Sequence, residues 1–186
     1  MIQPTDLRRG MVLDIDGNLW QVVEYQSFKI AMRGNIIKMK VKNIKTGAVV
    51  ERNVPSGERF TRAFLDTRPM QYLYSDDTGH VFMDQQDFEQ VTLSDADLGD
   101  NGRYYLKEGV EVQVQFYEDR PVGVDFPITL EFAVTQTDPG VKGDTVSGAL
   151  KPATMDTGLV VQVPLFINEG DKVRVDTRTG EYLGRA

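Results

Sequence analysis

Basic side chains gather in one short stretch of the N-terminal third, in a pattern that suits contact with a polyanion. The five residues are Lys29, Arg33, Lys38, Lys40 and Lys42. The last three alternate with apolar residues, so they share one face of a predicted strand, and the first two flank a predicted hairpin tip at 30–35. The stripe indicates either a surface that follows a phosphate backbone or a solvated edge strand whose lysines prevent pairing with another sheet.

Other groups able to do chemistry are few. The chain has no cysteine and one histidine, His80, which excludes disulfides, thiolate sites and histidine-based zinc sites. Asp76–Asp77 and the pair Asp84 and Asp87 have the right chemistry for metal or acid–base work, but they match no known ligand spacing, and a solvated acidic face is the favoured interpretation. The sequence places neither a serine nor an acid to serve His80, so we predict a structural or exposed histidine rather than a catalytic one. We predict no catalytic residue, no metal and no cofactor.

Charge is distributed unevenly along the 186 residues, whose net charge is −7. Residues 1–64 carry 11 basic and 6 acidic side chains, residues 65–127 carry 4 and 14, and residues 128–186 carry 6 and 8. The acidic total therefore hides a basic N-terminal segment of +5, and it does not exclude an RNA partner. No apolar leader and no run of about 20 apolar residues is visible, so we expect a cytoplasmic protein without a membrane segment.

The elements that position these groups are mostly strands. Strict alternation at 110–116 and 130–134, and β-rich runs elsewhere, are typical of half-buried strands separated by Gly-containing turns such as Asp16–Gly17. Residues 94–97 resemble a helix capping box, which predicts a helix toward residue 106, and a further helical turn is predicted at 6–10. Prolines 69 and 127 are expected to interrupt strand ladders. We therefore predict an all-β chain of three domains, at 1–64, 65–127 and 128–186.

Longer motifs give a family resemblance. The C-terminal third contains KPATMDTGLVVQVPLFINEG at 151–170, which resembles the signature of bacterial translation elongation factor P. Four other parts of the chain are similar to the same family and occur in the family's order, at 42–47, 71–74 with 81–84, 137–145 and 175–182. The resemblance covers essentially the whole chain.

The resemblance implies an SH3-like (KOW-type) barrel followed by two OB-fold barrels, arranged in an L like tRNA. It implies a monomeric, non-enzymatic translation elongation factor that binds the ribosome between the P and E sites. Its partners there are rRNA, ribosomal proteins and the peptidyl-tRNA in the P site. Positioning of that tRNA promotes peptide bond formation at stalling sequences such as consecutive prolines, an orientation effect.

The resemblance also implies the residues that contact tRNA and the ribosome. In the first domain they are Lys29, Met32, Arg33, Gly34, Asn35, Lys38, Lys40 and Lys42. In the third domain they are Gly143, Asp144, Thr145, Tyr182 and Arg185. The hairpin tip departs from the family, because Met32 occupies the position that often carries a modified lysine or arginine. We hypothesise that the tip works unmodified, with Arg33 supplying charge near tRNA phosphates.

Three alternatives stay open from the sequence. A hydrolase or metal enzyme would have to use carboxylates such as Asp76 or Asp84, because histidine and cysteine are scarce. An RNA-binding adaptor would bind free RNA but not ribosomes. A specialised paralogue of elongation factor P would share the fold and an unmodified tip, and it would rescue a narrower set of stalling motifs.

Overall fold

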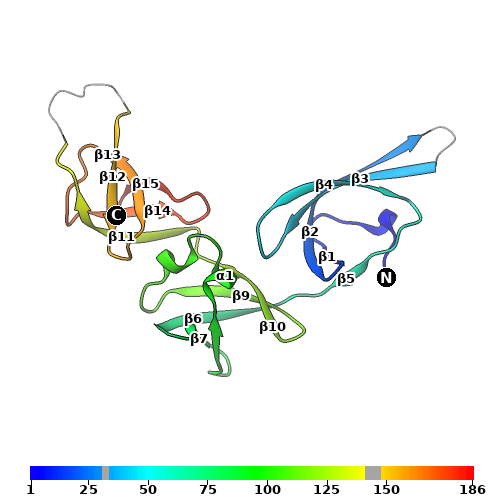
Figure 1. Ribbon diagram of the computed structural model, residues 1–186, viewed down its shortest axis with the longest axis horizontal. Helices are drawn as coiled ribbons and strands as arrows, with labels where there is room; N and C mark the ends of the chain where they lie inside the picture. The colour runs from blue at the N-terminus through cyan, green and yellow to red at the C-terminus, as the bar shows by residue number, and fades with distance from the viewer. Residues whose placement is uncertain (31–33, 141–147) are drawn as a thin grey trace. The chain divides into compact units, whose positions relative to one another are not determined.

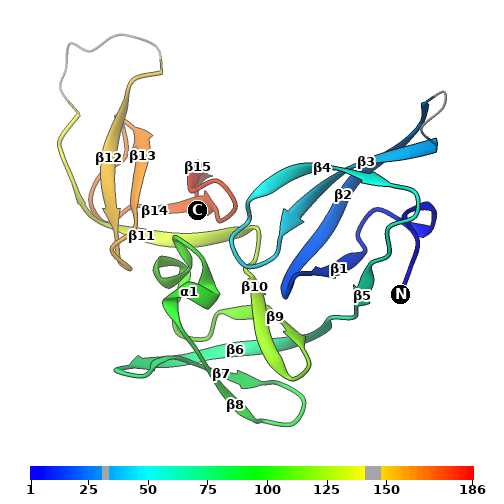
Figure 2. The same cartoon turned by 45° about the vertical axis from the view of Figure 1, so that its right-hand side comes forward.

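The computed structural model of the chain describes residues 1–30, 34–140 and 148–186, and the backbone alone for residues 29, 30 and 34. In these residues the chain forms three five-stranded sheets and a few short helical turns (Figures 1 and 2). It divides into two compact units, residues 1–68 with 114–123, and residues 69–113 with 124–186. Within the part of the chain described, no helix is long and apolar enough to cross a membrane.

The first sheet builds the N-terminal core. Its strands, in spatial order, are β4 (Val49–Pro55), β3 (Gly34–Asn43), β2 (Asn18–Ile30), β1 (Val12–Ile15) and β5 (Thr61–Ala63). Asp16 and Gly17, with φ of 54° and 76°, make the tight β1–β2 turn that the sequence predicted. The core side chains are Leu7, Leu13, Val22, Ile37, Met39, Val41, Val54 and Phe60. The helical turn lies at η1 (Pro4–Asp6), earlier than the predicted 6–10.

The second sheet contains the strictly alternating segment 110–116 as a strand. Its order is β10 (Arg120–Asp125), β9 (Glu111–Tyr117), β6 (Asp66–Asp76), β7 (Gly79–Asp84) and β8 (Gln90–Leu93). Every second side chain of β9 from Val112 to Phe116 is buried, as the alternation predicted. The expected break at Pro69 is wrong, because Pro69 lies inside β6. Proline lacks only the N–H, and the Pro69 carbonyl still accepts a hydrogen bond from the Gln85 N–H at 3.2 Å.

The third sheet closes around the C-terminal core. Its order is β13 (Val160–Pro164), β12 (Leu150–Met155), β11 (Thr129–Thr137), β14 (Lys172–Asp176) and β15 (Glu181–Arg185). The buried side chains of the core are Tyr105, Phe132, Val134, Ala153, Met155, Leu159, Val161, Val163, Ile167, Val173 and Val175. All but Tyr105 come from the third sheet and its turns. The predicted strand at 130–134 corresponds to β11, and two of the other β-rich runs form β13 and β14.

The predicted helix after residue 94 is two short pieces, α1 (Asp95–Leu98) and η2 (Gly102–Tyr105). The capping box is present: the Asp97 N–H donates to Ser94 Oγ at 3.3 Å, and the Ser94 N–H donates to Asp97 Oδ2 at 2.9 Å. Gly99, with φ of 83°, ends α1. The expectation of one helix to residue 106 is therefore wrong, and the second piece turns Tyr105 into the core of the third sheet.

Candidate nucleic-acid interface

The lysine stripe lies on β3 as predicted. Ile37, Met39 and Val41 are at most 2% exposed in the N-terminal core. The intervening residues Lys38, Lys40 and Lys42 lie on the opposite face of the strand. β3 pairs with both β2 and β4, so it is an inner strand of its sheet. The interpretation of the lysines as protection of an edge strand is therefore wrong.

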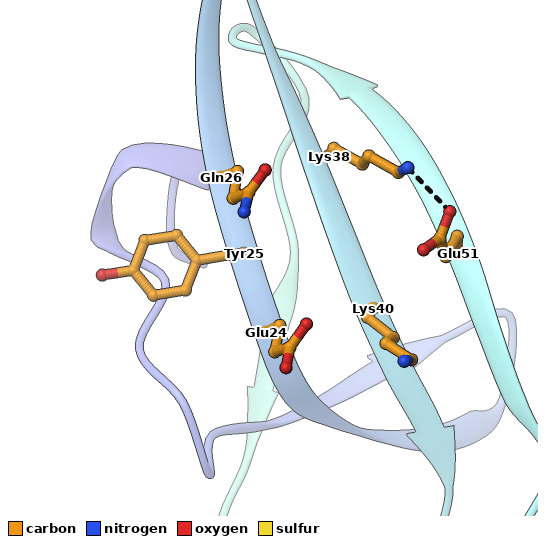
Figure 3. Close-up of a pocket in the computed structure, with 6 residues that line it drawn as sticks. All are labelled: Glu24, Tyr25, Gln26, Lys38, Lys40 and Glu51. Carbon is orange, nitrogen blue, oxygen red and sulfur yellow. Dashed lines mark ion pairs between the residues drawn. The ribbon is translucent and has the colours of Figure 1, made fainter.

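Carboxylates from both neighbouring strands face the lysines. Lys38 Nζ lies 2.8 Å from Glu51 Oε2 of β4, and Lys40 is in register with Glu51 on one side and Glu24 of β2 on the other (Figure 3). The hydrogen bond from Lys38, followed by the charges of Lys38 and Lys40, lowers the pKa of Glu51 below its ordinary value. Together with Tyr25 and Gln26 these side chains line a shallow depression of about 150 Å³. The face is a mixed-charge surface rather than a purely basic one.

A bulge in β2 brings Glu24 to this face. The register shifts between Val22, which pairs with Val41, and Glu24, which pairs with Lys40. Without an extra residue, Val22 and Glu24 would lie on the same face, because side chains alternate with a period of two. Sequence reasoning missed both Glu24 and Glu51. The bulge carries no sequence signal. The β-rich run at 49–54 indicated a strand that contains Glu51, but the register that brings Glu51 to the lysines is set only by the pairing of β4 with β3.

The hairpin extends well past this depression. The pairing of β2 with β3 runs from Trp20–Asn43 to Ile30–Gly34, so the two strands form a long arm (Figures 1 and 2). The backbones of Lys29 and Asn35 pair near its end. The expected contact residues Met32 and Arg33 lie outside the described residues, as do the side chain of Lys29 and, in the C-terminal loop, Gly143, Asp144 and Thr145.

The two remaining expected contact residues lie on β15. Tyr182 is half-buried against the C-terminal core. Arg185 donates from Nη2 to Asp171 Oδ2 at 2.9 Å, and its guanidinium carbon lies 5.3 Å from the centre of the Phe166 ring. Arg185 is thus held in place on an aromatic surface, with its side chain 53% exposed. Their roles as contacts stay predictions.

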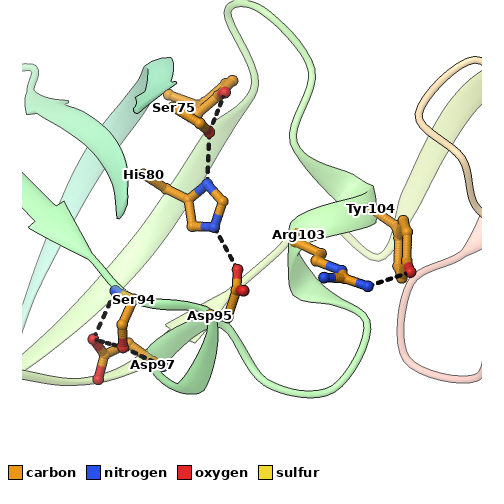
Figure 4. A network of polar contacts seen from close by, with 8 residues as sticks. Ser75, His80, Ser94, Asp95, Asp97, Arg103 and Tyr104 are labelled. Atoms are coloured by element: carbon orange, nitrogen blue, oxygen red, sulfur yellow. Dashed lines mark hydrogen bonds and ion pairs between the residues drawn. The ribbon is translucent and has the colours of Figure 1, made fainter. Parts of the chain in front are cut away.

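His80 is placed differently from the sequence expectation. Its Nδ1 lies 2.6 Å from Ser75 Oγ, and its Nε2 lies 2.6 Å from Asp95 Oδ1 (Figure 4). The statement that no serine or acid serves His80 is therefore wrong, because the β6–β7 hairpin brings Ser75 beside it and the start of α1 brings Asp95. Serine hydrolases use the opposite ring nitrogens for these two partners. Ser75 Oγ also bonds the Tyr72 hydroxyl at 2.7 Å, so the chain of contacts ties the hairpin to α1.

The acidic residues of the middle segment serve local structure. Asp76 Oδ1 accepts from the Thr78 N–H at 2.8 Å, and the hydrogen bonds from Thr78 lower the pKa of Asp76. Asp84 is 4% exposed, and its Oδ1 accepts from the Gln86 N–H at 2.7 Å. Among residues 1–30, 34–140 and 148–186, no group of three or more histidine or acidic side chains converges as a metal site would require. The carboxylates therefore act as turn-forming groups.

Comparison with known families decides the identity. Three family models match in order: the elongation factor P KOW-like domain at 4–60, the elongation factor P OB domain at 65–124 and the elongation factor P C-terminal domain at 130–185. The chain belongs to the elongation factor P family. It is a translation elongation factor, with a KOW-like barrel followed by OB-type β domains. The exact limits 1–64, 65–127 and 128–186 stay predictions.

Relatives match this family member along its entire length. The elongation factor P of Coprothermobacter proteolyticus is 48% identical over 185 residues, covering 100% of this chain and 99% of the relative. Those of Pelotomaculum thermopropionicum and Thermotoga maritima are 45% and 47% identical, with 100% of each chain covered.

Solved structures support the same fold. Eukaryotic translation initiation factor 5A from Methanococcus jannaschii gives a TM-score of 0.51 at 21% identity, covering 68% of this chain and 90% of that one. A protein of the same initiation factor family from Naegleria fowleri gives 0.54 at 13% identity, covering 67% and 96%. At these identities the likeness concerns the fold alone.

Proposed function

We propose that this family member binds the ribosome between the P and E sites as a cytoplasmic monomer. It promotes peptide bond formation at stalling sequences such as consecutive prolines by positioning the peptidyl-tRNA. The observation that carries the proposal is the match to elongation factor P along the whole chain. The long β2–β3 arm adds support, because a two-stranded ribbon with a basic end can enter a narrow RNA-lined space.

The proposed mechanism is orientation rather than chemistry by the protein. Proline fixes φ and restricts the residue before it, so consecutive prolines make a reactive geometry hard to reach. A factor that holds the peptidyl-tRNA in a productive position lowers the entropic part of the barrier, while the ribosome supplies the reacting groups. No catalytic residue or cofactor of the protein takes part. This fits a chain with no cysteine and a single histidine that is engaged with Ser75 and Asp95.

The tip is proposed to act without a covalent modification. Met32 cannot take the modifications that lysine or arginine receives, so Arg33 supplies the positive charge beside tRNA phosphates. Intact-mass measurement on protein from its native host tests this point. A mass equal to that of the unmodified chain is expected, and an added group on Arg33 or Lys29 would contradict it.

Reconstituted translation of a message that encodes consecutive prolines tests the main proposal. Adding the protein should raise the yield of full-length product, and no increase would reject the function. A chain that binds free RNA but not ribosomes would instead be an RNA-binding adaptor. Rescue confined to a narrow set of stalling sequences would indicate a specialised paralogue.

Arg33→Ala separates positioning from affinity. Rescue should fall while ribosome binding, which is spread over all three domains, largely persists. Lys45→Ala is the matched control, because it removes the same charge from an exposed turn at the other end of β3. Equal losses of rescue and binding in Arg33→Ala would mean that Arg33 is only an affinity contact.

A further inference from the structure

The lysine face of β3 offers less free positive charge than its sequence indicates. Lys38 is engaged by Glu51, and Lys40 lies in register between Glu24 and Glu51. Lys42 differs, because its neighbours in register are uncharged and it has no carboxylate partner within the described residues. Among these three lysines, the charge open to an arriving phosphate is therefore concentrated at Lys42, the lysine farthest from the hairpin tip.

We propose that Glu51, assisted by Glu24, is a specificity-determining residue that lowers the affinity of this face for RNA in general. The inference rests on the proposed function, in which the arm contacts RNA of the ribosome and tRNA. Glu51 acts by occupying Lys38 and facing Lys40 in the free protein. Specificity depends on the difference between the affinity for the intended partner and the affinity for other RNA. Lowering the affinity for other RNA therefore raises specificity.

The physical basis is an exchange of ion pairs. A phosphate that approaches Lys38 displaces a carboxylate oxygen 2.8 Å from the ammonium group, so one exposed ion pair replaces another and little free energy is gained. An arbitrary RNA strand has no other contacts to offset the exchange. A partner that fits the whole arm is held through its other contacts, so its binding does not depend on displacing Glu51 from Lys38. The carboxylates therefore weaken non-specific binding more than docked binding.

Glu51→Gln tests the proposal with an oligouridine as the generic RNA. The substitution frees Lys38, so binding should tighten, and the slope of log affinity against log salt should steepen by about 0.7, the value for one added phosphate contact on a single strand. Because of this difference in slope, the gain in affinity should be about 2.6-fold larger at about 50 mM salt than at about 200 mM salt. Glu58→Gln is the matched control, because Glu58 is exposed and has no ion pair within the described residues.

A second substitution identifies the lysine. In the wild-type background, Lys38→Gln should change oligouridine affinity little, because Lys38 is already engaged. In the Glu51→Gln background, the same change should remove the gain. Equal effects of Lys38→Gln in both backgrounds would overturn the proposal, as would equal effects of Glu51→Gln and Glu58→Gln, because either would indicate a general charge effect.

Ribosome binding completes the test. Glu51→Gln should raise affinity for ribosomes by a smaller factor than affinity for oligouridine, so the ratio of the two affinities falls. An equal or larger rise for ribosomes would show that Glu51 does not discriminate and would refute the proposal. If the wild-type chain fails to bind ribosomes or to rescue synthesis, the proposed function is wrong, while the oligouridine results still decide whether Glu51 restrains Lys38.

Discussion

Tyr105 gives the sharpest test of how the C-terminal β domain is held together. It precedes β9 in the sequence, yet its side chain is 4% exposed in the core of the third sheet. Its ring centre lies 5.5 Å from that of Phe126 and 6.4 Å from that of Phe132. A tyrosine ring buries about 200 Å², worth about 5 kcal/mol at about 25 cal/mol per Å². Because alanine keeps the Cβ, we expect Tyr105→Ala to lower the free energy of unfolding by about 4 kcal/mol, within the range for buried aromatic residues.

Denaturant titration with two probes measures the effect. Hydrogen exchange of β11 and β14 reports on the third sheet, and fluorescence of Trp20, the chain's one tryptophan, reports on the N-terminal core. The denaturant concentration at the unfolding midpoint, as reported by hydrogen exchange, should fall in Tyr105→Ala. The Trp20 midpoint should move less, because Trp20 belongs to the other compact unit. Tyr105→Phe is the control and should cost under about 0.5 kcal/mol, since its hydroxyl makes no hydrogen bond within the described residues. A loss below about 1 kcal/mol in Tyr105→Ala, or equal losses in both variants, would refute the reasoning.

Two further perturbations test local interactions. Arg178 donates to Asp176 from Nη2 at 2.7 Å and lowers the pKa of Asp176 from 3.8 to about 2. The contribution of this ion pair to stability is therefore complete above 3.8, the ordinary pKa of Asp176, and is lost as the pH falls through about 2. As the pH falls from 3.8 to about 2, the urea concentration at the midpoint of unfolding should fall in the wild type and fall less in Asp176→Asn. Equal falls in the two proteins would contradict the assignment. Ser94→Ala removes the cap of α1 and should cost about 1 kcal/mol in thermal unfolding, and an unchanged midpoint would show that the cap contributes nothing.

The strands could be predicted from the sequence because their side chains alternate between core and solvent, which gives a hydrophobic pattern with a period of two residues. The alternation at 110–116 predicted β9, and the alternation at 37–42 predicted both β3 and the shared lysine face. Tight turns were equally readable, since Asp16 and Gly17 tolerate positive φ. These features depend on neighbouring residues alone, which is why one sequence suffices to find them.

Features that depend on distant residues escaped the sequence. Nothing near Tyr105 indicates that it belongs to the core of the third sheet, because the partners that bury it lie from residue 126 onward. His80 meets Asp95 across 15 residues of chain, and only the folded hairpin and α1 set that distance. The placement of Glu24 depends on a bulge, and a bulge reverses the face that periodicity assigns.

The candidate site shows how a count of charges differs from a charged surface. Residues 1–64 carry a net charge of +5, and this count alone predicts a strongly basic face. The register of β2, β3 and β4 instead places Glu24 and Glu51 beside Lys38 and Lys40, so the middle of the arm is nearly balanced. Charge that is balanced in the free protein does little to attract RNA from a distance, because opposite charges at short range cancel beyond a Debye length. Recognition along the arm would then depend on a partner whose shape brings phosphates to within contact of the lysines.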